Sequence, residues 1–422
     1  MNILLLGSGG REHTFAWKIA QSPLCSKLFI APGNAGTDAL GINIDLNVLD
    51  FDAIAEFSLK EVISMIVVGP EAPLVEGIAD YFSNNPILSD IQIIGPNAKA
   101  AQLEGSKAFS KIFMEKYHIP TAGYKEFTAE TSEAGKDYIE QSNTPIVLKA
   151  DGLAAGKGVL ILNDKEEAKT ELDNMLNGKF GSAGSTVVIE DFLDGLEFSV
   201  FVLTNGKDYV LLPEAKDYKR IGEGDTGLNT GGMGAVSPVP FVDSILMEKV
   251  RTRIIEPTIK GLSADEIHYE GFIFFGLIKV DDEPMVIEYN CRMGDPETEV
   301  VIPRLKNDLV ELFKSMKDDT LGKQEIDFES NSAATVMLVS GGYPEAYEKG
   351  KVISGLDLKT GSILFHAGTK KSANDIITNG GRVLAITSLA ESKDSALEQS
   401  KSIAEKISFE GKYFRTDIGF DL

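Results

Sequence analysis

Two lysines in a glycine-rich stretch near residue 150 have the types and spacing of a phosphate-binding segment. Lys149 directly follows the apolar residues 146–148, and Lys157 stands between Gly156 and Gly158. Glycines let backbone N–H groups approach a polyphosphate closely, and lysines act as point charges on its oxygens. The chemistry that this stretch could support is therefore the binding of a nucleotide polyphosphate.

This stretch is not a P-loop. The P-loop pattern places four residues between its glycines and Ser or Thr after its lysine. Here three residues separate Gly152 from Gly156, and Gly158 follows Lys157. Taken alone, the stretch is explained equally well by an idle glycine hairpin with incidental lysines.

A carboxylate and an amide stand at the end of a predicted strand, residues 285–290. Residues two apart on a strand share a face, so we expect Glu288 and Asn290 to project together. We expect Ile287 and Tyr289 to face the other way. Carboxylate and amide oxygens are hard ligands, and this pair suits Mg²⁺ that arrives with nucleotide phosphates.

Three more charged residues follow that strand within one tight turn: Arg292, Asp295 and Glu297. The plainer alternative is a solvated strand end. Such an end would not usually concentrate so many polar groups, so we interpret the segment as a site.

Two other loops could bind anions. Residues 216–238 mix cations, hydroxyls and glycines, which suits a polar anionic substrate, although a long surface connection is the alternative. Near the start, Gly7 and Gly9 match a dinucleotide fingerprint, but its third glycine is replaced by Glu12. The next apolar run also lacks the acid that would bind a ribose, so NAD binding and an oxidoreductase are excluded. The first loop and Arg11 suit one phosphate monoester, and a structural tight turn explains them equally well.

The elements that must position the first loop form a parallel sheet. Continuous apolar runs, rather than alternating ones, recur with helical segments between them, which is typical of a sheet covered on both faces. The runs are residues 2–6, 28–31, 65–69 and 91–95. Turns of glycine and proline follow the later runs at the carboxyl ends, where open parallel sheets bind ligands.

The rest of the chain divides into two further units. A long helical pattern stops before Pro120, and this proline predicts a domain boundary. We expect an α/β and α+β multidomain protein with an N-terminal open parallel sheet (residues 1–104), a central domain (105–326, with a compact flap at about 121–192) and a small α+β domain (327–422). The last of these has no obvious catalytic constellation.

Composition excludes several classes of protein. The 422 residues carry a net charge of −23, which argues against general binding to nucleic acid or anionic membranes. Two cysteines cannot form a disulfide framework, and there is no zinc-binding spacing, signal peptide or long apolar segment. We therefore expect a soluble, cytoplasmic protein.

Many separate blocks, in order along nearly the whole chain, resemble the phosphoribosylamine–glycine ligases (glycinamide ribonucleotide synthetases), which are ATP-grasp enzymes of purine biosynthesis. The blocks are residues 7–13, 32–37, 68–75, 102–109, 149–159, 229–234, 288–298, 366–369 and 379–382. The resemblance implies a central ATP-grasp fold and a reaction that joins glycine to 5-phospho-β-D-ribosylamine through glycyl phosphate. It also implies ATP as a substrate, Mg²⁺ or Mn²⁺ as cofactor and small molecules as partners. We expect a monomer, with transient contact to the preceding pathway enzyme conceivable.

The resemblance also implies roles for individual residues. Catalytic roles fall to Lys149, Arg292 and Asp295, and the metal ligands are Glu288 and Asn290. The ATP-binding residues are Lys107, Lys149, Gly152, Gly156, Lys157, Gly158, Glu190, Asp191, Phe192, Leu193 and Glu197. The substrate-binding residues are Gly9, Gly10, Arg11, Asn34, Glu71, Asp217, Lys219, Arg220 and Arg292.

Three positions depart from the family pattern. Met293 replaces a phenylalanine, which is conservative in an apolar slot. Tyr218 stands where relatives commonly have histidine, so a proton-transfer role there is in doubt. Residues 271–280 also lack the metal-binding acid of many ATP-grasp relatives, so the metal set rests on Glu288, Asn290, phosphates and water.

Two rival functions remain open from the sequence. One is a related ATP-grasp carboxylate–amine ligase with a different acceptor, which the first loop and the region of Glu71 would decide. The other is a non-catalytic nucleotide-binding module, which would require the loss of Glu288, Asn290 or Lys149. All three residues are present.

Overall fold

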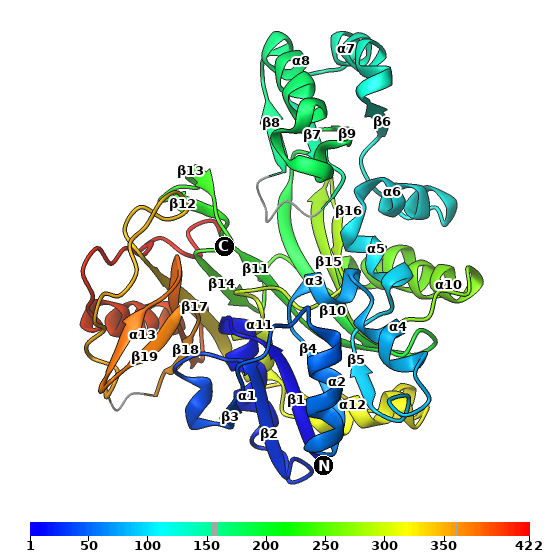
Figure 1. Cartoon of the computed structure of the whole chain (residues 1–422). Coiled ribbons are helices and arrows are strands. Elements are labelled where there is room, and N and C mark those ends of the chain that lie inside the picture. Colours follow the sequence, from blue (N-terminus) through cyan, green and yellow to red (C-terminus); the bar gives the residue numbers. More distant parts are fainter. Residues whose placement is uncertain (153–157, 359–360) are drawn as a thin grey trace.

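The computed structural model describes residues 1–152, 158–358 and 361–422. Three bodies of structure are visible in Figure 1: a parallel sheet near the N-terminus, a long central sheet, and a small sheet that stands apart with two helices. This arrangement confirms the predicted fold class.

The N-terminal sheet is parallel and has the order β3-β2-β1-β4-β5. Its strands are β1 (Asn2–Gly7), β2 (Lys27–Pro32), β3 (Ile42–Asn43), β4 (Ile63–Val68) and β5 (Gln92–Ile94), and its helices are α1 (Gly10–Ile19), α2 (Phe51–Lys60), α3 (Glu71–Val75) and α4 (Ile78–Ser83). The strands read as continuous apolar runs because both faces are covered; residues 3–6 of β1 are fully buried. The register sets Gly7 beside Pro32, so the predicted turns gather at one edge.

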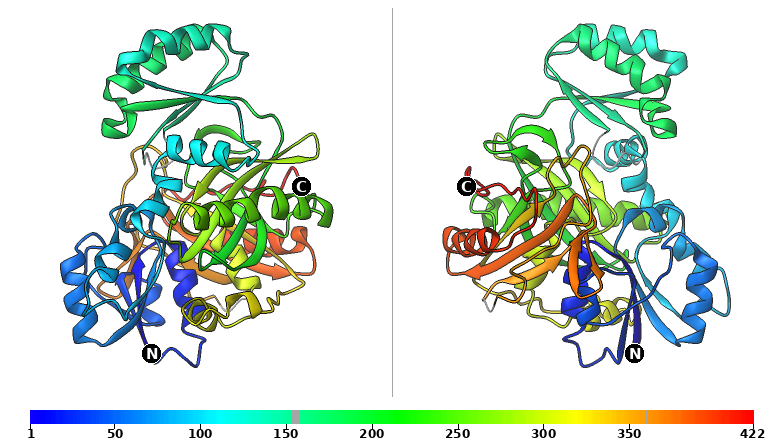
Figure 2. Two further views of the ribbon diagram at one scale, coloured as in Figure 1. Left: turned by 90° about the vertical axis from the view of Figure 1, so that its right-hand side faces the viewer. Right: turned by 60° about the vertical axis from the view of Figure 1, so that its left-hand side comes forward.

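The small sheet has the order β6-β9-β7-β8 and contains Lys149 at its centre. It consists of β6 (Tyr124–Thr128), β7 (Ile146–Ala150), β8 (Val159–Leu162) and β9 (Thr186–Asp191). Two helices, α7 (Ser132–Gln141) and α8 (Lys165–Asn174), pack on its side away from the rest of the molecule (Figures 1 and 2). Its core is separate from the other hydrophobic clusters and includes Leu148, Leu172 and Ile189.

The central sheet runs through two of the predicted units. Its order is β16-β15-β10-β11-β14-β17-β21-β18. The strands are β10 (Leu196–Thr204), β11 (Tyr209–Asp217), β14 (Gly234–Ser237), β15 (Gly271–Val280), β16 (Glu283–Asn290), β17 (Ser332–Val339), β18 (Ile363–His366) and β21 (Arg382–Ala390). Antiparallel pairing of β14 with β17, from Gly234↔Val336 to Ser237↔Ala333, carries the sheet across residue 327.

The remaining elements cover and connect these sheets. The helices are α5 (Ala98–Gly105), α6 (Lys107–Lys116), α9 (Ser244–Val250), α10 (Glu256–Ala264), α11 (Thr298–Arg304), α12 (Leu309–Lys317) and α13 (Lys393–Lys406). Two small ribbons are β12 (Arg220–Gly222) with β13 (Thr226–Asn229), and β19 (Thr369–Ser372) with β20 (Asp375–Thr378). Within the described ranges, no helix has the length and apolar character that crossing a bilayer requires.

Phe201 on β10 tests the packing of the central sheet. Its ring is fully buried and lies 5.1 Å from that of Phe274 on β15. We expect Phe201→Ala to lower the free energy of unfolding by about 3–5 kcal/mol, because it removes the ring and leaves a cavity. Urea denaturation measures this. Ile245→Ala, at an exposed position, is the control and should change stability by less than about 0.5 kcal/mol.

Candidate active site

Lys149 joins the small sheet to the central sheet. From β7 its Nζ lies 2.9 Å from Glu190 Oε2 on β9 and donates a hydrogen bond of 3.2 Å to the carbonyl of Ile287 on β16. Ile287 directly precedes Glu288. The structure therefore brings together the lysine of the glycine-rich stretch and the strand that ends in the predicted metal ligands.

A second buried lysine shares the same carboxylate. Lys111 Nζ on α6 lies 3.2 Å from Glu190 Oε2 and donates to Thr121 Oγ1 at 2.8 Å. Burial lowers the pKa of Lys111 to about 8, although Glu190 opposes the shift. Two ammonium groups thus face one carboxylate, which leaves excess positive charge for an anionic ligand. Lys111 was not among the predicted site residues.

Lys107 lies at the first turn of α6, beside the described edge of the glycine-rich stretch. Its Nζ donates to the carbonyl of Gly152 at 3.3 Å. The N-terminus of α6 is held by Asp151, whose carboxylate accepts the N–H of Ala108 at 2.7 Å. Burial lowers the pKa of Lys107, and the charge of Glu288 opposes this. Gly152 and Lys107 are therefore adjacent, while the predicted Gly156 and Lys157 lie outside the described residues and Gly158 directly precedes β8.

A polar pocket opens on the central sheet between the predicted ribose and metal positions. Its lining includes Glu197, Asp217, Lys219, Ile287 and Glu288. Lys219 Nζ lies 3.2 Å from Glu197 Oε2 and 3.9 Å from Asp217 Oδ1. Those two carboxylates raise the pKa of Lys219, and Lys219 lowers the pKa of Glu197. Burial raises the pKa of Asp217.

The prediction for Ile287 is wrong. Gly276 pairs with Glu288 and Leu277 pairs with Val286, so Ile287 is an extra residue in a β-bulge. The bulge breaks the two-residue alternation, and Ile287 lines the pocket together with Glu288. Tyr289, in contrast, is buried against the core as expected.

The predicted metal ligands are few but chemically suitable. Glu288 and Asn290 are both half-buried near the end of β16. Among the described residues, no group of three or more His, Cys, Asp or Glu is placed to hold a metal ion. One carboxylate and one amide oxygen fit Mg²⁺ that keeps phosphate and water ligands, rather than a site made only of protein atoms.

Arg292 is fixed by two carboxylates. Its Nη2 lies 2.7 Å from Glu104 Oε1 on α5, and its Nε lies 3.4 Å from Glu71 Oε2 on α3. Glu104 Oε2 also accepts the N–H of Cys291 at 2.8 Å. Burial raises the pKa of Glu104, although the charge of Arg292 opposes this shift. Burial also acts to raise the pKa of Glu71, but the charges of Arg292 and Arg11 outweigh it and lower that pKa. Glu104 was not predicted because its role depends on contacts between distant segments.

Glu12 occupies the first glycine loop. Its carboxylate accepts the N–H of Gly9 at 2.6 Å and pairs with Arg11 Nε at 2.6 Å. Its side chain lies so close to Gly7 and Gly69 that neither position has room for a Cβ. The two glycines thus make space for a protein carboxylate, and Arg11 is held further by its Nη1, which donates to the carbonyl of Met293 at 3.1 Å.

Asp295 lies at the other side of this loop. It accepts the N–H of Arg11 at 3.3 Å and forms an ion pair of 3.0 Å with Arg382 on β21. Arg382 and Arg11 lower its pKa against the effect of burial. These contacts join the N-terminal unit, the site turn and the C-terminal strands; the catalytic role of Asp295 stays a prediction.

Asn34 uses its side chain within the protein. Its Nδ2 donates to the carbonyls of Ser8 and His366 at 2.9 and 2.8 Å, and its Oδ1 accepts the N–H of Gly36 at 2.9 Å. A substrate contact from Asn34 would have to replace one of these hydrogen bonds.

The remaining predicted residues lie at the edges of the site. Asp191 ends β9, and Phe192 and Leu193 follow it in the connection to β10; Asp191 and Phe192 are exposed. Arg220 donates to the carbonyl of Gly227 at 2.8 Å, within the small ribbon. Tyr218 is buried and points away from the pocket toward Asp421, to which its hydroxyl donates at 2.7 Å. It is therefore not placed for proton transfer in the pocket.

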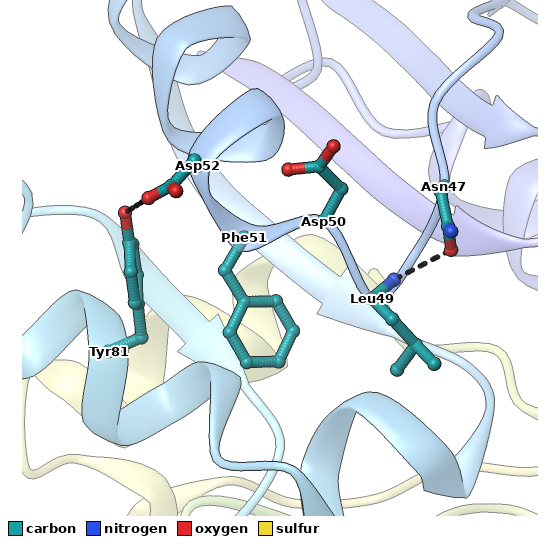
Figure 3. Close-up of a pocket in the computed structure, with 6 residues that line it drawn as sticks. All are labelled: Asn47, Leu49, Asp50, Phe51, Asp52 and Tyr81. Atoms are coloured by element: carbon teal, nitrogen blue, oxygen red, sulfur yellow. Dashed lines mark hydrogen bonds between the residues drawn. The ribbon is translucent and has the colours of Figure 1, made fainter.

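A separate surface hollow lies on the N-terminal unit (Figure 3). Its lining residues are Asn47, Leu49, Asp50, Phe51, Asp52 and Tyr81. The N–H of Leu49 donates to Asn47 at 3.0 Å, the hydroxyl of Tyr81 donates to Asp52, and Asp50 accepts the N–H of Ala53 at 3.0 Å. None of these residues belongs to the predicted site.

A small sheet joined to a central sheet through a buried lysine, with an acid-lined pocket on the central sheet, defines a protein of the ATP-grasp class. The same fold occurs in a biotin carboxylase domain from Hydrogenobacter thermophilus, solved with MgADP and bicarbonate (TM-score 0.72, 18% identity, covering 99% of this chain and 92% of that one).

The chain belongs to the phosphoribosylglycinamide synthetase family. Family models for its N, ATP-grasp (A) and C domains match residues 1–104, 105–298 and 333–421. The chain is 45% identical to a phosphoribosylamine–glycine ligase of Yersinia pestis, over 100% of this chain and 98% of that protein. The crystal structure of a phosphoribosylamine–glycine ligase from Thermotoga maritima matches with a TM-score of 0.86 and 36% identity, covering 99% of this chain and 100% of that one. The protein is thus an ATP-dependent ligase of purine biosynthesis, as predicted.

Glu104 offers a test of how Arg292 is positioned. We expect Glu104→Ala to lower kcat at least about tenfold, because the guanidinium loses its closest fixed partner. The affinity for ATP should stay within about twofold, because Lys107 and Lys149 are untouched. Steady-state kinetics and nucleotide titration measure the two effects, and equal losses in both would contradict this role.

The buried pair His13 and His366 predicts how stability depends on pH. The backbone N–H of His366 donates to His13 Nδ1 at 2.7 Å. Burial and His366 lower the pKa of His13 to about 3, and burial lowers that of His366 to about 4. Between these values and pH 6.5 the unfolded chain binds more protons, so stability is complete above about pH 6.5 and falls as the pH decreases.

Urea denaturation at pH 7.5 and pH 5 checks this dependence. Each histidine contributes a slope of up to about 1.4 kcal/mol per pH unit. We expect His366→Gln to make the fall shallower. His268→Gln is the contrasting variant: Glu270 raises the pKa of His268, so removal of His268 should not make the fall shallower. A fall of unchanged steepness in His366→Gln would refute the assignment.

Proposed function

We propose that this protein joins glycine to 5-phospho-β-D-ribosylamine and converts ATP to ADP and phosphate. The observation that carries the proposal is the hydrogen bond from Lys149 Nζ to the carbonyl of Ile287. It sets a phosphate-binding lysine one residue from the predicted metal ligand Glu288. The names of the full-length relatives support glycine and the ribosylamine as substrates.

The chemistry requires activation of a carboxylate. A carboxylate and an amine at neutral pH form a salt rather than an amide. An oxygen of the glycine carboxylate therefore attacks the γ-phosphorus of ATP, and ADP leaves. The ribosylamine nitrogen then attacks the carbonyl carbon of glycyl phosphate, and phosphate leaves. These steps need alignment and neutralisation of charge rather than a protein nucleophile.

The residues around the nucleotide neutralise and align its phosphates. Lys107 and Lys149 contact phosphate oxygens, and Lys111 shares Glu190 with Lys149. Glu197 binds the ribose, and residues 190–193 border the adenine. Glu288 and Asn290 would hold Mg²⁺ or Mn²⁺, which when bound neutralises charge on the transferred phosphoryl group.

The other substrates lie on either side of Arg292. Its guanidinium, held by Glu104 and Glu71, steadies the glycine carboxylate and the charge that develops on it. The ribosylamine binds where Gly9, Gly10 and Arg11 meet Glu71. We further propose that the protein acts as a monomer in the cytoplasm, with at most transient contact to the enzyme that supplies the labile amine.

A different acceptor is the main alternative within the class. The loop at residues 9–11 decides it, because this loop borders the proposed acceptor site. Thermal shifts with glycine and with other small carboxylates compare their binding, since a carboxylate that binds the ATP-bound protein stabilises it by mass action.

Phosphate release in the presence of ATP, Mg²⁺, glycine and ribosylamine tests the proposed reaction. We expect omission of any one component to reduce release to background. Arg292→Ala and Glu288→Ala should each lower kcat by about 100-fold or more, because they remove charge that acts on the transition state. Release that is indifferent to glycine would rule out the reaction, and full turnover by either variant would remove that residue's role.

A further inference from the structure

The segment of residues 413–422 runs along the loop that carries Lys219. The hydroxyl of Tyr413 donates to the carbonyl of Ile221 at 2.9 Å, and Thr416 Oγ1 donates to Glu223 at 2.5 Å. The segment is itself fixed to α13, because Lys393 Nζ donates to the carbonyls of Gly419 and Leu422 at 2.9 and 2.6 Å. Since α13 packs on β17 and β21, this contact ties the segment to the central sheet.

Asp421 forms the contact closest to the pocket. One carboxylate oxygen accepts the hydroxyl of Tyr218 at 2.7 Å, and the other lies 2.9 Å from Lys216 Nζ. The ring of Tyr218 is 1% exposed, and the Lys216 side chain is also buried. Both partners lower the pKa of Asp421 against the effect of burial. The carboxylate is therefore held charged between two buried groups.

Arg415 fixes the far end of the same loop. Its side chain is fully buried, its Nη1 donates to the carbonyl of Arg220 at 3.0 Å, and it pairs with Asp225 at 2.6 Å. Asp417 completes the group, because it binds the guanidinium with both oxygens at 2.8 Å and accepts the N–H of Gly224 at 2.7 Å. Two ion-pair groups thus hold the loop at both ends.

The direction of the side chains connects these contacts to the pocket. Along residues 216–219, Lys216 and Tyr218 point to the 413–422 segment, whereas Asp217 and Lys219 line the pocket. This is the alternation of an extended chain. The contacts that fix Lys216 and Tyr218 therefore also fix the backbone from which Asp217 and Lys219 project into the pocket.

We propose that Asp421 is a positioning residue for the nucleotide side of the active site. It sets the position of Lys219 and Asp217 through Tyr218 and Lys216, and it contacts no substrate. The inference rests on the proposed function for the identity of the nucleotide pocket. It assigns the 413–422 segment a part in ATP binding, although this segment lies outside the ATP-grasp strands that surround the nucleotide.

Three variants and two measurements test the proposal. Asp421→Ala removes both contacts, Asp421→Asn keeps an acceptor for the Tyr218 hydroxyl, and Tyr218→Phe removes only that hydroxyl. We measure kcat and each KM, and separately the affinity for ATP with Mg²⁺ by calorimetry. Glu410→Gln is the control, since this exposed residue pairs with Lys351 rather than with the loop.

We expect kcat/KM for ATP to fall about tenfold in Asp421→Ala, below the roughly 100-fold that a 1 Å displacement can cost. The same kcat/KM should fall less in Asp421→Asn and Tyr218→Phe, and it should be unchanged in the control Glu410→Gln. The KM for ribosylamine should not change, because the hydrogen bonds that Gly9 and Arg11 donate run to Glu12, Met293 and Asp295 rather than to the segment. A merely structural role would alter all KM values together.

Retention of the wild-type kcat/KM for ATP in Asp421→Ala, or an equal loss for all substrates, would overturn the proposal. If Asp421→Ala does not fold, the two milder variants decide by the same criteria. Calorimetry with ATP keeps the outcome independent of the overall reaction. A wild-type protein that binds ATP but does not use ribosylamine would refute the proposed function and leave this inference testable.

Discussion

The contact between Lys149 and β16 is the interaction on which the arrangement of the site depends. A lysine on the small sheet donates to the central sheet at a carbonyl that a β-bulge makes accessible. Because Glu190 takes up only part of the charge of Lys149 and Lys111, the contact also leaves a positive potential where phosphates are proposed to bind.

The sequence predicted the elements that local pattern determines. The apolar runs of β1, β2 and β4 and the strand that carries Glu288 and Asn290 lie where periodicity indicated, since burial of one or both faces is recorded in adjacent residues. The glycine-rich stretch could be recognised but not assigned. Its assignment to a nucleotide site depends on the contact of Lys149 with Ile287, which is more than 130 residues away in the chain.

Other features could not be read from local pattern, for three physical reasons. The bulge at Ile287 is a property of pairing between two strands, and neither strand alone specifies it. Glu104 and Arg382 act through partners in other units, so the family blocks 102–109 and 379–382 that contain them do not indicate what either side chain contacts. Glu12 correctly excluded the dinucleotide pattern. Its position between Gly7 and Gly69 could not be predicted, because it depends on two strand ends that meet only in the folded protein.

The passage of the central sheet from β14 to β17 limits how the chain can be divided. Removal of the residues beyond 327 would leave β14 with a row of unpaired N–H and C=O groups that β17 now satisfies. Exposed strand edges of this kind promote aggregation by pairing with other chains. The nucleotide-binding part and the C-terminal part are consequently not independent modules that a gene fusion could exchange at residue 327. The two parts share one continuous sheet.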